Sequence, residues 1–176
     1  MNKKMHGPTD DSYWVLPGRL AAGAYPGSRY FDEQTSKNLS QLLASGVNLF
    51  VNLTQAHELP PYEKILHEQA GWLDMQAEHR RFPIVDMSCP SRTQVIEVLD
   101  AIDTALSRGV VVYVHCWAGV GRTGTIIGCH LARHGMTGEE ALTRIAVLRK
   151  GLSHAWPRSP ETDEQIAFVR SWKVGE

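Results

Sequence analysis

The chain has 176 residues, a formal net charge of −1 and 43% hydrophobic residues, which suits one globular domain with an adequate core. The near-neutral net charge does not indicate binding to nucleic acids or anionic membranes, and no apolar run is long enough to span a bilayer. Three cysteines without a Cys-x-x-Cys pair argue against a disulfide framework or a zinc site. We therefore expect a cytoplasmic protein that binds neither nucleic acid nor membranes.

The chain alternates between strand and helix patterns. Residues 1–12 are polar, without the hydrophobic stretch of a secretory signal, and are expected to form a flexible tail before a single domain over residues 13–176. The patterns predict strands at 13–16, 20–22, 49–53 and 110–114 and a short one that ends at Asp86, with helices at 33–45, 61–69, 93–108, 123–133 and 137–150. This alternation predicts an α/β fold with a mainly parallel sheet covered by helices on both faces.

A glycine-rich turn joins the strand at 110–114 to the helix at 123–133. It places Cys116 at the carboxyl end of a buried strand, where a helix N-terminus, backbone donors and a nearby cation stabilise a thiolate. The planar fork of Arg122 can hold two phosphate oxygens, and the Thr123 hydroxyl can donate to the sulfur. His115 is expected to orient the cysteine and its loop. The five residues between Cys116 and Arg122 form a cup for the phosphate, and they are Trp117, Ala118, Gly119, Val120 and Gly121.

This run resembles the His-Cys-x5-Arg-Ser/Thr signature of the cysteine-dependent protein tyrosine and dual-specificity phosphatases. The resemblance implies a tyrosine-phosphatase-like α/β fold over roughly residues 13–172, a phosphocysteine intermediate and no metal or cofactor. Phosphotyrosine in a phosphoprotein or phosphopeptide is the first expected substrate, with phosphoserine and phosphothreonine also open. Trp117 departs from the small or polar residue often found there, and it can either narrow the pocket mouth or pack against the sheet.

Such chemistry needs an acid that protonates the leaving oxygen. Asp86 lies in a loop shaped by flanking prolines, 30 residues before Cys116, and resembles the family's general acid. By the same resemblance, Asp86 then acts as a base for the water that hydrolyses the phosphocysteine. Cys89 lies in this loop too. Its disulfide with an oxidised Cys116 is one hypothesis, and an ordinary loop cysteine is the favoured one.

Near the end of the chain, residues 161–165 resemble the Gln-Thr-x-x-Gln loop that orients water in tyrosine phosphatases. Gln165 is then a candidate for positioning the hydrolytic water, although Glu161 replaces the first glutamine. The alternative is the first turn of an amphipathic helix that begins at Ser159 and Pro160 and buries positions 166, 169 and 172.

Other functional interpretations stay open. His130 and His134 have the i, i+4 spacing of metal ligands, but the pattern holds no acidic partner, so polar helix positions are favoured. Residues 117–121 include no lysine or arginine, which argues against multiply charged lipid headgroups. The alternatives to a protein phosphatase are a small-molecule phosphatase, such as an inositol polyphosphate hydrolase, and a non-catalytic phosphopeptide-binding module. The oligomeric state is not predicted.

Overall fold

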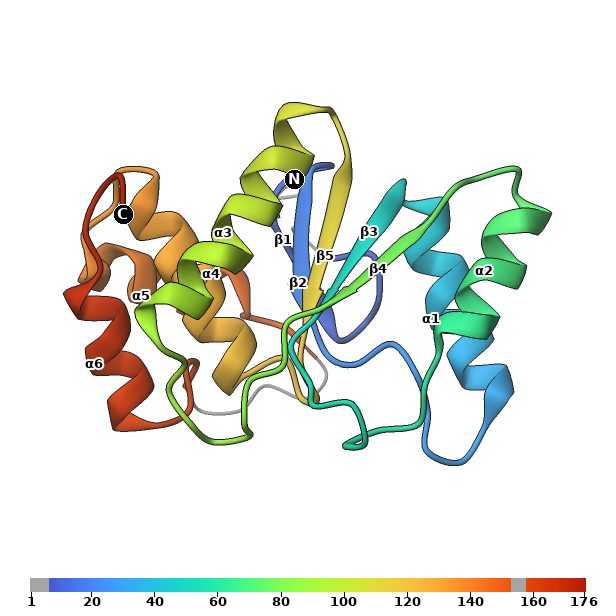
Figure 1. The fold of residues 1–176 in the computed structure, drawn as a ribbon, viewed down its shortest axis with the longest axis horizontal. Coiled ribbons are helices and arrows are strands. Elements are labelled where there is room, and N and C mark those ends of the chain that lie inside the picture. The colour runs from blue at the N-terminus through green and yellow to red at the C-terminus, as the bar shows by residue number, and fades with distance from the viewer. Residues whose placement is uncertain (1–6, 153–157) are drawn as a thin grey trace.

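A computed structural model describes residues 7–152 and 158–176, and its centre is one five-stranded sheet (Figure 1). The strand order is β1-β2-β5-β3-β4, in which β1 and β2 pair antiparallel and the other three pairs are parallel. The predicted α/β fold with a mainly parallel sheet is therefore confirmed. The strands are β1 (Ser12–Leu16), β2 (Leu20–Gly23), β3 (Val47–Asn52), β4 (Glu78–Arg81) and β5 (Val111–His115).

Helices cover both faces of the sheet, as Figure 1 shows. The side chains of β5 alternate between the two faces: Tyr113 packs with the helices on one side, and Val112 and Val114 pack on the other. None of the helices in the described ranges is long and apolar enough to cross a bilayer. The pair on the Tyr113 face is α1 (Asp32–Ala44) and α2 (Glu63–Trp72), and the group on the opposite face is α3 (Arg92–Ser107), α4 (Gly121–Arg133), α5 (Gly138–Leu148) and α6 (Asp163–Ser171).

The ends of α3 and α5 follow from local side-chain chemistry. Ser91 and Gln94 form a capping box at the start of α3, and Thr137 and Glu140 form one at the start of α5. Gly109, at φ +76°, supplies the left-handed residue just beyond α3. The predicted crossover helix at 93–108 and the capping box at residue 137 are confirmed.

The prediction of a strand that ends at Asp86 is wrong. The strand lies earlier, as β4, and its ladder with β3 ends at Arg81 because β3 itself ends at Asn52. Beyond the ladder, the N–H groups of Phe82 and Ile84 still donate to the carbonyl oxygens of Asn52, the last residue of β3, and of Leu53, which follows it. Pro83, between them, has no N–H to donate. Asp86 therefore lies in a loop and not on a strand.

Candidate active site

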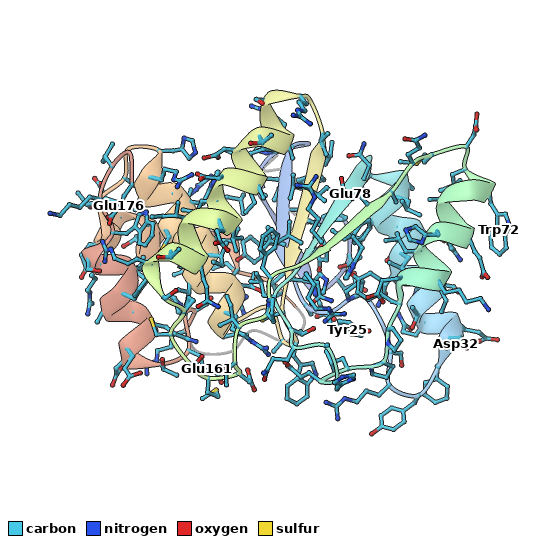
Figure 2. The ribbon with its side chains drawn as sticks, in the orientation of Figure 1. Tyr25, Asp32, Trp72, Glu78, Glu161 and Glu176 are labelled. Atoms are coloured by element: carbon cyan, nitrogen blue, oxygen red, sulfur yellow. The ribbon has the colours of Figure 1, made fainter. Side chains whose placement is uncertain are left out.

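The loops that follow β3, β4 and β5 meet along the lower edge of the sheet in Figure 1. This is the carboxyl edge of the parallel strands, where open α/β sheets bind their ligands. Figure 2 shows Tyr25, from the loop after β2, and Glu161, from the loop before α6, toward the same edge. The sequence positions with predicted roles thus converge on this edge.

Four carbonyl groups at the loop between β5 and α4 accept hydrogen bonds from the surrounding fold. The N–H groups of residues 117–123 donate to no acceptor within the described ranges, so they form a concave nest of the kind that binds anions. The predicted cup therefore exists as a geometric feature. Its bonded carbonyls, each with its donor, are Cys116 (His115 Nδ1, 3.1 Å), Trp117 (Tyr25 N, 2.8 Å), Gly119 (Arg149 Nη1, 2.6 Å) and Val120 (Ser159 Oγ, 2.7 Å).

Gly119 is the position at which the cup requires glycine. Its φ of +70° lies in the left-handed region, and a Cβ there would fall 2.3 Å from the backbone carbon of Gly23 at the end of β2. Gly121 has a different neighbour, because a Cβ there would lie 3.1–3.2 Å from the side chains of Gln165 and Glu161. The loop is therefore packed against β2 on one side and the start of α6 on the other.

Two carboxylates hold the Arg122 side chain, which is 1% exposed. Glu58 accepts from both terminal nitrogens, at 2.7 Å from Nη1 and 2.6 Å from Nη2, and Asp86 Oδ1 lies 2.8 Å from Nη2. The carbonyl oxygen of Ile84 accepts a further bond from Nη1 at 3.1 Å. Asp86 thus reaches the cup, as expected of its loop, while Glu58 fixes the orientation of the guanidinium.

One donor of Arg122 remains available to a ligand. Its Nε is buried and has no hydrogen-bond partner in the described part of the chain. Burial lowers the pKa of Arg122, but the bonds from Glu58 and the nearby Cys116 outweigh it and raise that pKa, so the side chain stays charged. The Cys116 side chain is 3% exposed, at the carboxyl end of β5.

His115 is a neutral, fully buried residue that ties the cup to α2. Burial lowers the pKa of His115 to about 3, so the ring is neutral at neutral pH, keeps a single N–H and is not the imidazolium that would act as an acid. Its Nδ1 lies 3.1 Å from the Cys116 carbonyl oxygen, which only accepts, and its Nε2 lies 2.7 Å from the Tyr62 hydroxyl. We assign the proton to Nδ1 on this ground, which leaves Nε2 to accept from Tyr62. His115 therefore connects the Cys116 backbone to the Tyr62 hydroxyl.

Gln165 is fully buried and connects three segments of the site. Its Oε1 accepts from the N–H groups of Glu161 and Thr162, and its Nε2 donates to the Ser88 carbonyl oxygen in the Asp86 loop at 3.0 Å. The alternative start of the last helix at positions 159 and 160 is wrong, because α6 begins after a capping box of Thr162 and Gln165. Gln165 therefore caps this helix and also lies beside Gly121 of the cup.

The remaining residues singled out from the sequence are Thr123, Trp117 and Cys89. The Thr123 hydroxyl is buried and has no hydrogen-bond partner among the residues that the structure describes, so no bond from it to sulfur is formed here. Trp117 is half-exposed and faces outward, and the guanidinium of Arg29 lies 4.9 Å from the centre of its ring. Cys89 is a free, partly buried thiol in the Asp86 loop, and burial raises its pKa.

Sequence reasoning missed three residues that shape this site: Glu58, Tyr62 and Arg149. Glu58 follows β3 and could have been found from the rule that loops at the carboxyl ends of parallel strands form ligand sites. Tyr62 and Arg149 gave no such signal, because each reaches the cup only through the packing of its helix region against the sheet.

Residues 26–136 match a family model described as "Polymorphic toxin system, DSP-PTPase phosphatase". Because this match covers well over half of the chain, the chain belongs to that family, and the resemblance read from the cysteine and arginine signature is confirmed.

Curated relatives point to the same superfamily. The chain is 30% identical to the tyrosine-protein phosphatase CDC14 of Saccharomyces cerevisiae over 118 residues, which are 66% of this chain and 21% of that protein. It is also 30% identical to the dual specificity protein phosphatase CDC14AB of Danio rerio, over 94% of this chain and 26% of that protein. The chain therefore spans about a fifth to a quarter of the length of these two relatives.

Solved structures share the fold. The crystal structure of Tk-PTP in the active form superposes with a TM-score of 0.69 at 24% identity, over 97% of this chain and 96% of that one. At this identity the similarity establishes the tyrosine-phosphatase fold.

Proposed function

We propose that the chain is a protein phosphatase that hydrolyses phosphotyrosine, and also phosphoserine or phosphothreonine where they reach the cup, through a phosphocysteine intermediate. One observation carries the proposal: Cys116 and Arg122 border a loop whose N–H groups donate to no acceptor among the described residues and whose carbonyls accept bonds from the surrounding fold. A dianionic phosphate ester is the ligand that this combination of backbone donors and a charged fork fits best.

In the first step the Cys116 thiolate attacks phosphorus, an S–P bond forms, and the P–O bond to the substrate breaks. Asp86 gives its proton to the leaving oxygen, while Arg122 and the loop N–H groups take up charge on the equatorial oxygens. In the second step water attacks the phosphocysteine, Asp86 accepts its proton, and the thiolate leaves. The partnerless Thr123 hydroxyl is a suitable donor to that departing sulfur.

The free Nε of Arg122 indicates how substrate enters this cycle. A phosphate oxygen that takes Nε and competes for Nη2 displaces Asp86, whose contact with Arg122 is at Nη2 and whose side chain is about half-exposed. Asp86 is then released toward the leaving group. Glu58 keeps its two bonds on the outer side and holds the guanidinium in place. Gln165 is proposed to place the hydrolytic water, since its amide lies beside Gly121 and bonds the Asp86 loop.

The charges near the cup favour a phosphoprotein over an inositol polyphosphate. Three carboxylates, from Glu58, Asp86 and Glu161, lie at or beside it, and they repel a ligand with several phosphates. The exposed side chains around the site are apolar. Val85 and Met87 flank Asp86, Trp117 belongs to the cup, and each of the three is at least half-exposed. Such a rim suits contact with the side chains of a polypeptide.

Comparing three substrates tests the proposal: a phosphotyrosine peptide, a phosphoserine peptide and inositol hexakisphosphate, each followed by phosphate release. We expect the highest kcat/KM for the phosphotyrosine peptide and no turnover by a Cys116→Ser variant that still binds the peptide. Faster hydrolysis of inositol hexakisphosphate would favour the small-molecule alternative. Peptide binding without turnover by the parent protein would favour the binding module.

We also infer that residues 13–176, together with Ser12 at the start of β1, work as one domain and that the protein is cytoplasmic. Both faces of a single sheet hold the core, which supports one domain. The location rests on the three cysteines, which are all free thiols. Fractionation of cells that express the tagged full chain tests it.

A further inference from the structure

A second cluster of ligating side chains lies at the end of α4 remote from the cup. α4 begins in the cup and runs 13 residues, which is about 20 Å, to Arg133. There Asp103 of α3 meets His130 and His134, and one ligand atom from each lies within 4.8 Å of the others. Glu176, labelled at the upper left of Figure 2, contacts Arg133 at this same end. The cluster is therefore separate from the phosphate site.

The distances within the cluster resemble those around a tetrahedral metal ion. Asp103 Oδ1 lies 2.9 Å from His134 Nε2 and 3.6 Å from His130 Nδ1. Two ligands of a tetrahedral zinc ion, at bond lengths of about 2.0–2.2 Å, lie roughly 3.3–3.6 Å apart. Small movements of these side chains, of which His134 is half-exposed, would place all three at ligand distance.

The Nδ1 atom of His130 is a second observation that points to a ligand at this cluster. The residue is 2% exposed, and within the described ranges of the chain its Nδ1 makes no hydrogen bond, since Asp103 Oδ1 lies 3.6 Å away. A buried polar atom without a partner is rare in native proteins and calls for an explanation.

Asp103 is held as metal-binding carboxylates commonly are. Its Oδ1 faces both histidines, while its Oδ2 accepts from Arg133 Nη1 at 3.0 Å. Such outer hydrogen bonds orient a ligand and leave its other oxygen free. Asp100, 2.7 Å from Arg133 Nη1, balances part of the arginine's charge.

We propose that Asp103, His130 and His134 form a zinc-binding site that clamps α3 to α4. The set of two imidazoles and one carboxylate is one that Zn²⁺ takes in proteins. All three side chains line a pocket of about 440 Å³, which leaves room for water as the fourth ligand. The spacing of His130 and His134 could not reveal an acidic partner. The carboxylate is that of Asp103 in α3, which lies 27 residues before His130 in the chain.

The test is a Zn²⁺ titration of the full-length chain in a Cys116→Ser background, which removes the thiolate of the cup as a competing ligand. A chromogenic chelator in competition gives the stoichiometry and the affinity. We expect one Zn²⁺ per chain and an affinity at least about tenfold lower in His134→Ala and Asp103→Asn. His67→Ala is the matched control, because His67 is an exposed histidine of α2, and it should bind Zn²⁺ as the parent does.

A second readout keeps the result clear if a variant is damaged. Co²⁺ in place of Zn²⁺ should give visible absorption bands of a four-coordinate site in the parent and lose them in His134→Ala, whose half-exposed side chain can be removed without opening the core. Melting temperatures without metal check that each variant folds. Equal Zn²⁺ affinity in the parent, His134→Ala and Asp103→Asn would overturn the proposal, as would Co²⁺ spectra that His134→Ala leaves unchanged.

Discussion

Glu58 is the residue whose replacement most directly tests how the cup works. Glu58→Gln keeps the size of the side chain but presents an amide N–H₂ to one of the two Arg122 nitrogens now bonded at 2.6 and 2.7 Å. One charge-assisted hydrogen bond is lost, worth about 1.5–3 kcal/mol. The remaining carboxylate on Arg122 is Asp86, so the acid is held more tightly on the arginine and away from the leaving group.

If the same free energy is lost from the transition state, kcat/KM for a phosphotyrosine peptide falls roughly 10- to 150-fold. The free energy of unfolding, from urea titration, should fall by about 1.5–3 kcal/mol. Glu68→Gln is the control, since Glu68 forms an exposed pair with Lys64 at 3.9 Å, and it should change stability by less than about 0.5 kcal/mol. A Glu58→Gln protein with the parent's kcat/KM and urea midpoint would refute the positioning role.

The other predictions test the acid, the buried histidine and the loop backbone. Asp86→Ala should lower kcat about 10²–10⁴-fold on a phosphotyrosine peptide and far less on an aryl phosphate with a good leaving group, as steady-state kinetics on both substrates will reveal. Tyr62→Phe leaves His115 Nε2 without its 2.7 Å partner and should cost about 1–3 kcal/mol in urea unfolding. Gly119→Ala should abolish activity through its clash with β2, whereas Gly18→Ala, at a similar φ of +69° but with open space, should cost only about 1–2 kcal/mol and keep activity. Between pH 6.5 and about 3 the unfolded chain binds a proton at His115 that the folded chain does not. The free energy of unfolding therefore falls as the pH is lowered through that window, by up to about 4–5 kcal/mol from this group. Urea midpoints of the parent should fall more steeply with acid than those of His115→Gln.

The elements found from the sequence were those with strong local signals. Helix α3 combines an apolar stripe, a capping box and a terminal glycine, so its bounds were predicted to within a residue. The position of the strand before Asp86 was predicted wrongly because β4 has the sequence Glu-His-Arg-Arg, which has no apolar pattern. It forms because its backbone pairs with β3, which is a non-local interaction that residue type does not report.

The site shows the same division. Cys116 and Arg122 are six residues apart, so one turn brings them together, and their residue types and spacing can be recognised in the sequence. Glu58, by contrast, lies 64 residues before Arg122 and meets it only because β3 and β5 are neighbours in the sheet. Asp103 and His130 meet because α3 packs on α4, and the local sequence around either residue does not predict this contact.

By itself the sequence determined the family, the layered α/β fold and the residues that make up the loop between β5 and α4, because these depend on short spacings and on periodic burial. The tertiary structure alone decided which distant charges complete the two sites: the carboxylates on Arg122, the tyrosine on His115 and the aspartate beside the α4 histidines. The reason is physical, since a hydrogen bond or ion pair depends on atoms being a few ångströms apart, and over long stretches of chain that distance is set by how strands pair and helices pack.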